Sequence, residues 1–387
     1  MVTPHTWHPG ARWLDPKWAI PIELQPDELL SSWLVRAALA NGCDPLVLTG
    51  NLWPRWRPWT TDIDRYISSR KLVQLSSLSG IPVLAFKQST LASVLDDFID
   101  TKHLPQGVWP WILSIGARNT RRRLGLQYCP LCLLEDSAAY FRIQWRLSWN
   151  TACPKHKTLL LAQCPRCGSF IEPHRLQAED RKVSVCAKCK YELFKAKPLT
   201  TVEEALFFQN CIDAVVKGGS GKIWGIEYKT KAWLDSISYL ISFVRRMGII
   251  APSHLARFFQ KLDLEPCTDI PLMPSYRFES LDAYDRQTIA AHIWSILNLP
   301  YSIIEEAFHN ERITKQMLCP KGIKVPFFLR HCWENAPDNT SCRRNNTGNI
   351  PKGRSIHAVR VMGKKLERQL KRRRYEEQKQ RATNSIL

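Results

Sequence analysis

The stretch YCPLCLLEDSAAYFRIQWRLSWNTACPKHKTLLLAQCPRCG, from Tyr128 to Gly168, carries five cysteines in about forty residues. Together with the residues that follow, it predicts two sets of metal ligands. The first set has the spacing C-x2-C-x20-C-x2-H and consists of Cys129, Cys132, Cys153 and His156. The second has the spacing C-x2-C-x18-C-x2-C and consists of Cys164, Cys167, Cys186 and Cys189.

These residue types at these spacings point to zinc. Zn²⁺ takes four tetrahedral ligands from thiolate or imidazole groups, and a two-residue gap lets one tight turn present two of them. The separations between pairs fall at or just outside the range of roughly 15–20 residues typical of such sites. Other pairings between the two sets, or His174 in place of His156, remain open.

The expected role of the two Zn²⁺ ions is structural. A catalytic zinc keeps three protein ligands and one open position, whereas each set offers four ligands. The chain shows no nucleophile elbow, Walker loop or HExxH pattern. We therefore expect no enzyme and name no catalytic residue; a metal-dependent nuclease or hydrolase is the competing hypothesis from another class.

Composition suits a soluble cytoplasmic protein that binds a polyanion. The 387 residues are enough for two or three domains, no apolar run is long enough for a membrane span, and no export signal is visible at the N-terminus. In a reducing cytoplasm the 13 cysteines favour metal over disulfides. The net charge of +20 favours nucleic acid as a partner. Between Pro351 and Leu387, 12 Lys and Arg against three Glu contribute +9 of it.

We expect a mainly α fold with four parts. These are an N-terminal helical, helix-turn-helix-like domain (1–120), tandem zinc-ribbon-like modules (121–198), a C-terminal helical domain (199–337), and a linker with a basic tail (338–387). In the first part, apolar residues at helical spacing predict helices within residues 26–42, 61–82 and 90–104, with Asp27 and Glu28 in the first turn of the first helix. Turns at Gly80 and Pro82 permit a helix-turn-helix; a plain helical bundle, partner binding and DNA contact remain open for this unit.

The same periodicity predicts helices within residues 202–219, 231–248, 280–300 and 302–308. Thr201 with Glu204, and Ser302 with Glu305, have the spacing of capping boxes. Gly218 and Gly219 should stop the first of these helices. The second should bury a face made of Trp233, Ile237, Leu240, Ile241 and Val244.

Several basic and aromatic stretches are candidates for nucleic-acid or partner contact. Residues 135–152 predict an amphipathic helix that fills the module's core, with arginines that could face phosphate. RNTRRRLG (118–125) and the tail are either solvated charge or polyanion contacts. LWPRWRPW (52–59) reads as an extended anchor packed on this protein or a partner rather than a base-stacking platform. The candidates are Arg118, Arg121, Arg122, Arg123, Arg142, Arg146, Lys371, Arg372, Arg373, Arg374, Trp53, Trp56 and Trp59.

The sequence resembles the TniQ family of transposition target-selection proteins. YCPLCLLED, YFRIQWRLSW, CPKH and LLAQCPRCG carry the resemblance in the zinc module, and DELLSSWLVRAALANG with DIDR carries it near the N-terminus. It covers about residues 20–195. The resemblance implies a helix-turn-helix unit, two zinc modules and further helices in a non-catalytic adaptor.

The partners that the resemblance implies are those of transposition. They are a TnsC-like AAA+ ATPase, a CRISPR effector complex with its guide RNA (Cascade-like), target DNA and, as an open option, a second copy of the chain; no membrane is implied. The alternative is a TnsD-like, sequence-specific DNA-binding protein that recognises a fixed attachment site. The basic tail and a second helix-turn-helix after Thr200 would then supply base and phosphate contacts.

Overall fold

The computed structural model describes residues 18–96, 99, 108–115, 125–247, 254–264, 277–319, 324–338, 363, 366 and 367. The chain divides into two compact units, residues 1–338 and 339–387, and the elements below belong to the first. The candidate contacts at 118 and 121–123, and those at 371–374, lie outside the described residues. Among the helices that are described, none has the length and apolar character needed to span a membrane.

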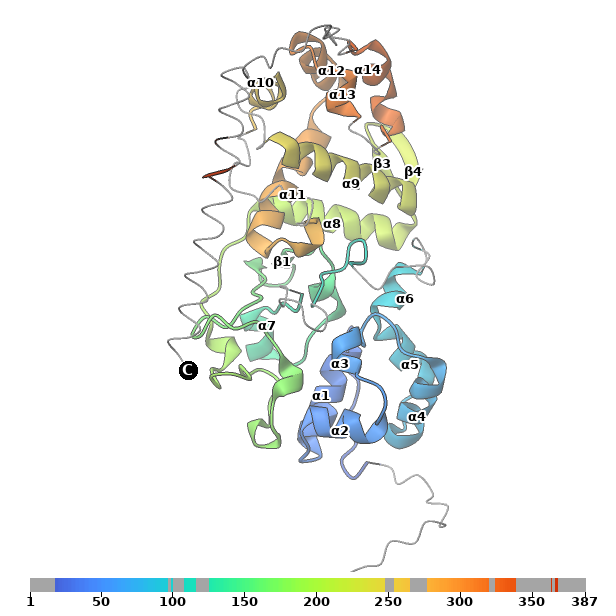
Figure 1. Cartoon of the computed structure of the whole chain (residues 1–387), viewed down its shortest axis with the longest axis vertical. Helices are drawn as coiled ribbons and strands as arrows, with labels where there is room; N and C mark the ends of the chain where they lie inside the picture. Colours follow the sequence, from blue (N-terminus) through green and yellow to red (C-terminus); the bar gives the residue numbers. More distant parts are fainter. Residues whose placement is uncertain are drawn as a thin grey trace, which may run out of the picture. The chain divides into compact units, whose positions relative to one another are not determined.

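Short helices make up the N-terminal part, as the prediction of a mainly α fold requires (Figure 1). They are α1 (Leu30–Ala40), α2 (Pro45–Leu52), α3 (Pro58–Thr61), α4 (Ser69–Ser79), α5 (Val83–Gln88) and α6 (Leu91–Leu95). Trp33 on α1, Leu75 on α4 and Phe86 on α5 are buried in one hydrophobic cluster. Gly80 ends α4 with a φ of 79°, and three residues separate α4 from α5. A helix-turn-helix role for this pair stays a prediction.

The start of α1 differs from the prediction. Asp27 has a φ of 54°, so the chain turns before the helix and neither acidic residue lies in its first turn. Glu28 is instead buried, where it accepts hydrogen bonds from Ser32 Oγ (2.8 Å) and Arg36 Nη1 (2.6 Å). The carboxylate therefore holds α1 against the chain that leads into it.

The cysteine-rich part has little regular structure. It contains α7 (Pro130–Glu135), a small antiparallel sheet of β1 (Ala152–Cys153) and β2 (Thr158–Leu159), and four single 3₁₀ turns. The turns are η2 (Ile143–Arg146), η3 (Pro173–Arg175), η4 (Ala178–Asp180) and η5 (Leu193–Lys195).

The predicted amphipathic helix across residues 135–152 is wrong. Between the end of α7 at Glu135 and the start of β1 at Ala152 only η2 forms, because backbone groups of this segment bond to distant parts of the chain instead of to the next turn. Leu29 N–H donates to Phe141 O (2.9 Å), and Ile143 N–H donates to Asp27 O (2.8 Å). The expected core is nonetheless present, since the aromatic residues of the segment are all buried: Tyr140, Phe141, Trp145 and Trp149.

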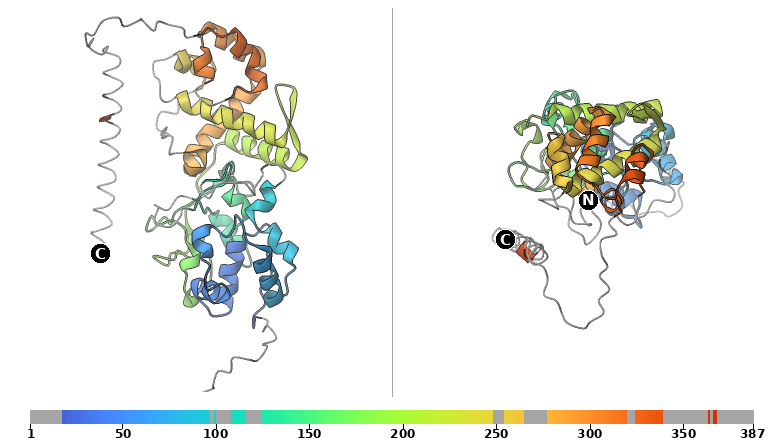
Figure 2. Two further views of the ribbon diagram at one scale, coloured as in Figure 1. Left: turned by 45° about the vertical axis from the view of Figure 1, so that its right-hand side comes forward. Right: turned by 90° about the horizontal axis from the view of Figure 1, so that it is seen from above.

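The C-terminal part is helical apart from one hairpin. Its elements are α8 (Glu203–Gly218), β3 (Ser220–Ile223), β4 (Ile226–Lys229), α9 (Thr230–Met247), α10 (His254–Lys261), η6 (Phe278–Ser280), α11 (Ala283–Asn298), α12 (Tyr301–Asn310), α13 (Lys315–Leu318), η7 (Phe327–Leu329) and α14 (Arg330–Asn335). α11 packs against both α8 and α9, and these three helices form the central layer in Figures 1 and 2. The predicted apolar face of α9 is buried, from Trp233 to Val244.

Both predicted capping boxes are wrong. Val202 precedes α8 as its N-cap, and Thr201 Oγ1 donates to Gln287 Oε1 on α11 (3.2 Å). Pro300 is the N-cap of α12, which places Ser302 inside the helix. The predicted stop of α8 is confirmed, because Gly219 closes the helix with a φ of 77°.

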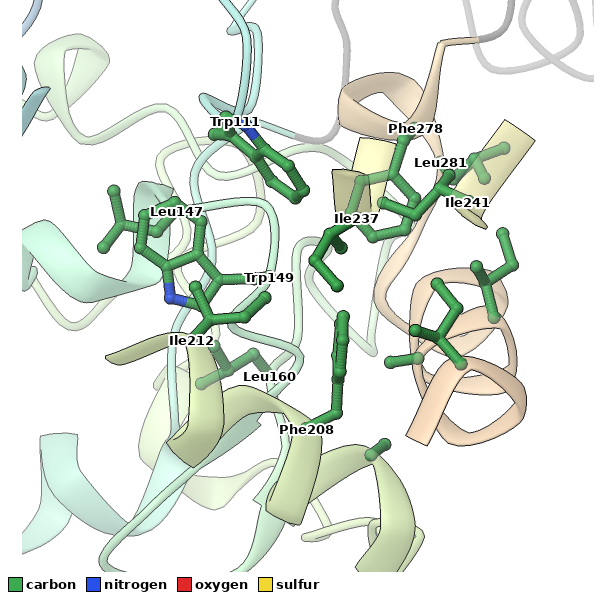
Figure 3. Close-up of a cluster of buried hydrophobic side chains, with 14 of the residues drawn as sticks. Trp111, Leu147, Trp149, Leu160, Phe208, Ile212, Ile237, Ile241, Phe278 and Leu281 are labelled. Carbon is green, nitrogen blue, oxygen red and sulfur yellow. The ribbon is translucent and has the colours of Figure 1, made fainter. Parts of the chain in front are cut away.

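One hydrophobic core joins the cysteine-rich part to the helical part. Trp149 lies next to Ile212 of α8 in Figure 3, and Trp111, Leu147 and Phe208 belong to the same cluster. The cluster continues to Ile237 and Ile241 of α9 and to Phe278 and Leu281. The predicted boundary between residues 198 and 199 therefore runs through shared side-chain packing.

A buried arginine reinforces the same junction. Arg286 of α11 has no exposed surface and donates to the carbonyl oxygens of Ser148 and Asn150. Burial lowers the pKa of Arg286 to about 10, which still leaves the guanidinium charged at neutral pH. The loop before β1 thus has its carbonyl groups satisfied by α11.

Candidate metal centres

The structure brings the eight predicted ligands together in two groups of four. In each group the ligand atoms all lie within 4.8 Å of one another. The groups follow the first partition proposed from the sequence: Cys129, Cys132, Cys153 and His156 in the first centre, and Cys164, Cys167, Cys186 and Cys189 in the second. His174 belongs to neither centre; its ring stacks on Trp59 with centroids 5.2 Å apart.

The distances between ligand atoms fit one tetrahedral ion per centre. Zn–S bonds of about 2.3 Å and Zn–N bonds of about 2.0–2.1 Å separate two sulfurs by about 3.8 Å and a sulfur from a nitrogen by about 3.6 Å. In the first centre, His156 Nδ1 lies 3.3, 3.4 and 3.5 Å from the three sulfurs. In the second, Cys164 and Cys189 are 3.6 Å apart, and Cys167 and Cys186 are 3.7 Å apart. The donor sets can therefore hold metal ions.

Three of the four ligand pairs lie on the same kind of turn. In each, the N–H four residues after the first cysteine donates to that cysteine's carbonyl oxygen, at 2.8 to 2.9 Å, and the donating residue has a positive φ. The donors are Lys157 (φ 49°), Gly168 (φ 65°) and Lys190 (φ 59°). We call these turns the knuckles. The remaining pair differs because Cys129 is the N-cap of α7 and Pro130 begins the helix.

The protonation states of the first centre are strongly coupled. Thiols of Cys132 and Cys153 donate to the Cys129 sulfur and hold its pKa well below the ordinary value. The same hydrogen bonds, together with burial, raise the pKa of Cys132. Closely packed thiols cannot all ionise unaided, and a divalent cation at their centre removes that conflict.

Glu135 fixes the orientation of the histidine ligand. With Nδ1 directed at the sulfurs, Nε2 of His156 lies 3.0 Å from Glu135 Oε2. The same oxygen accepts from Lys155 Nζ at 2.5 Å, and these bonds lower the pKa of Glu135, with Lys155 the larger cause. A carboxylate behind a ligating imidazole fixes its tautomer and raises its basicity. Sequence reasoning missed Glu135, although it lies three residues after Cys132 on α7.

The structure corrects the prediction that Arg146 contacts nucleic acid. Arg146 has no exposed surface and is paired with two buried carboxylates, Asp62 at 2.7 Å and Asp64 at 3.1 Å. Its Nη2 also donates to Leu113 O (2.9 Å). A guanidinium enclosed in this way cannot reach a phosphate, so Arg146 joins the N-terminal helices to the first metal module.

Arg142 is half-buried and held at the surface of the same module. Its guanidinium forms two hydrogen bonds with Asp136, of 2.7 and 3.1 Å, and lies over the rings of Tyr140 and Trp145. Contact with a partner would have to compete with the Asp136 carboxylate.

The three tryptophans of LWPRWRPW pack on this chain. Trp53 is buried and donates to Gln74 Oε1 (3.0 Å), and Trp59 donates to Thr49 Oγ1 (2.9 Å). Trp56 stands edge-on to Trp53 and faces the ammonium group of Lys71. The structure supports self-packing, but the segment is not extended: a turn follows Trp53, with Trp56 N–H donating to Trp53 O (3.0 Å), and α3 begins at Pro58.

A pair of carboxylates near the N-terminus is the second feature that sequence reasoning missed. Asp62 and Asp64 flank the buried Ile63, and Asp64 also accepts two bonds of 2.7 Å from Ser31. The alternation in Asp-Ile-Asp-Arg hinted at an extended segment with both carboxylates on one side. Arg146, the shared partner of the two carboxylates, lies more than eighty residues further along the chain.

Fold and sites together define a mainly helical protein with two four-ligand centres of the kind that bind structural metals. Residues 19–160 match the model of the TniQ family. The match supports a TniQ domain in this segment, which covers less than half of the chain, and TniQ indicates a family of transposition-associated target-selection adaptors. The match includes the first centre and ends before the second. No curated protein matches the sequence.

Proposed function

We propose that each centre binds one Zn²⁺ ion and that both ions are structural. The support is the complement of four soft donors at tetrahedral distances in each centre. A short, irregular module gains much of its folding free energy from such a site, roughly 10–16 kcal/mol of apparent binding free energy in zinc peptides. Elemental analysis of the purified protein should find two zinc ions per chain. Substantially less metal, or a metal-bound water detected by spectroscopy, would contradict the proposal.

We further propose that the protein is an adaptor in DNA transposition. In this role it links an RNA-guided CRISPR effector of the Cascade type, bound at target DNA, to a TnsC-like AAA+ ATPase. The observation that carries the proposal is the TniQ match over residues 19–160. Closed metal centres and a net charge of +20 support a scaffold that operates beside nucleic acid. The two zinc modules would hold docking surfaces in place and perform no chemical step.

Co-purification tests this role. The tagged full chain, expressed with effector and ATPase genes from the same locus, should retain both partners through a wash at moderate salt. Cys153→Ser should remove a ligand of the first centre and abolish retention together with folding of the module. Glu192→Gln, which removes only a surface ion pair with Lys195, is the matched control and should leave retention unchanged.

The TnsD-like alternative predicts a different result with the isolated protein. Its support is the basic C-terminal segment, with +9 between Pro351 and Leu387. A footprint of the purified chain at one unique DNA site would favour this function over the adaptor. Weak, salt-sensitive binding to arbitrary duplex, with no footprint, would favour the adaptor.

A further inference from the structure

The second metal module presents an excess of positive charge on its surface. Residues 164–198 contain eight Lys and Arg against four Asp and Glu, and all eight basic residues are exposed. Arg175, Lys190 and Lys195 are in ion pairs with neighbouring carboxylates. Within the described part of the chain, the others of this segment form no ion pair: Arg166, Arg181, Lys182, Lys188 and Lys197.

Two of these basic residues project from the metal centre itself. Arg166 immediately precedes Cys167 on one knuckle, and Lys188 immediately precedes Cys189 on the other. Because the four sulfurs lie within 4.8 Å of one another, the two knuckles meet at one point and hold the backbone of both residues next to it. Their backbone positions are therefore fixed before any ligand binds, which lowers the entropic cost of a contact.

A loop adds two more charges beside the knuckle that carries Cys186 and Cys189. Lys190 Nζ lies 2.6 Å from Asp180 Oδ2, and this ion pair ties the end of η4 to the knuckle. Arg181 and Lys182 follow directly, and both are exposed. Arg166, Arg181, Lys182 and Lys188 together form what we call the knuckle surface.

Neutralising the thiolates is the competing role for these side chains. A Zn²⁺ ion with four thiolates carries a net charge of −2. The sulfurs, however, already have backbone donors: N–H groups of Cys167 and Arg166 bond to Cys164, and those of Cys189 and Lys188 bond to Cys186. The exposed ends of the Arg166 and Lys188 side chains are thus available for another anion.

The chemistry of the surface indicates a phosphate backbone. The aromatic residues of the segment, Phe170, Tyr191 and Phe194, are half-buried, and the last two pack against the core. They offer no stacking platform for unpaired bases, whereas exposed Lys and Arg side chains suit phosphate oxygens. We propose that the knuckle surface binds the phosphate backbone of duplex DNA without reading its sequence. Only the choice of duplex DNA rests on the proposed function.

A charge-matched pair of double variants tests the proposal in the full chain. Arg166→Gln/Lys188→Gln removes two charges from the knuckle surface. Lys217→Gln/Lys231→Gln removes two exposed charges, also free of described ion pairs, from α8 and α9. Affinity for an arbitrary DNA duplex is measured by anisotropy across a salt series, and zinc content is determined for each protein.

The expected result is specific to the knuckles. Each lost phosphate contact lowers the slope of log K against log salt by about 0.9, so the knuckle variant should lose about 2 in slope and on the order of tenfold or more in affinity at low salt. The control should change the slope by much less. Arg166→Lys/Lys188→Arg keeps both charges and should bind like the unmodified protein.

Three outcomes would overturn the inference. The first is an equal loss of DNA affinity in the two charge-matched variants. The second is an unchanged salt slope in a knuckle variant that retains both zinc ions. The third is loss of zinc from that variant, which would show that the two side chains serve to neutralise the thiolates. Retention of the ATPase by the same variants is read separately. An adaptor that fails to retain the ATPase but shows knuckle-dependent DNA binding would refute the proposed function and leave this inference standing.

Discussion

Replacing Arg146 with methionine should destabilise the protein strongly without acting on nucleic acid directly. The change leaves two carboxylates, 5% and 2% exposed, without their shared cation. Breaking a buried ion pair in this way costs about 3–5 kcal/mol. The lower end applies here, because Arg65 Nε remains 3.1 Å from Asp62 and Ser31 still donates twice to Asp64. We expect a loss of about 3 kcal/mol in the free energy of unfolding.

Urea unfolding of the zinc-loaded protein, followed by tryptophan fluorescence, measures this loss. Arg142→Met is the matched control, since it removes the partly exposed ion pair with Asp136 and should cost about 1 kcal/mol or less. A double-mutant cycle with Asp64→Asn should give a coupling energy of about 1–3 kcal/mol. A loss below that of Arg142→Met, with coupling near zero, would refute the reasoning. So would reduced DNA affinity in an Arg146→Met protein shown to be fully folded.

Three further results are expected. Glu135→Gln should weaken metal binding at the first centre by about 10- to 100-fold, seen as faster transfer of one zinc to a chelator while the second is retained; equal transfer of both ions would contradict the assigned contact with His156. Arg286→Met should lower the free energy of unfolding by about 2–3 kcal/mol in the same urea assay, because two buried carbonyl groups lose their donor, and an unchanged midpoint would argue against that role. Burial, opposed by Arg146 and aided by Asp62, raises the pKa of Asp64 to about 6 from 3.8, so the folded state retains this proton to higher pH than the unfolded chain. The stability of the protein relative to Asp64→Asn should then fall by about 3 kcal/mol as pH rises from about 4 to 6 and level off above that; a rise over that range would show that the pKa is lowered instead.

Periodicity located the helices that bury a long apolar face. α1, α8, α9 and α11 each run for at least eleven residues, which is enough turns for a stripe to emerge from the pattern. α2, α3 and α5 have eight residues or fewer, and their sequences show no such stripe. Residues 135–152 do carry one, but hydrogen bonds to chain more than a hundred residues away outweigh it.

The sequence predicted the ligands of the metal centres better than the contacts of the residues around them. Spacing favoured the partition into two ligand sets, because a two-residue gap restricts which ligands share a turn, and the structure decided between it and the other pairings. The partner of Thr201 could not be inferred in this way, since Gln287 lies 86 residues further on. The same holds for Arg146 and its carboxylates, 82 and 84 residues earlier. These contacts depend on how separate helices meet, which pair spacing does not encode.

Gln209 has a consequence for dissecting this protein. From α8 its side-chain amide accepts from the N–H groups of Thr151 and Ala152 and donates to Ala152 O (3.1 Å), in the way that a neighbouring strand would. The open edge of the β1–β2 ribbon is thereby covered by a helix outside the TniQ match. A fragment cut after residue 198 would expose that edge, which is the geometry from which chains add to one another. Expression of residues 1–198 alone should accordingly yield aggregates, and extending the fragment through α8 should restore a dispersed product.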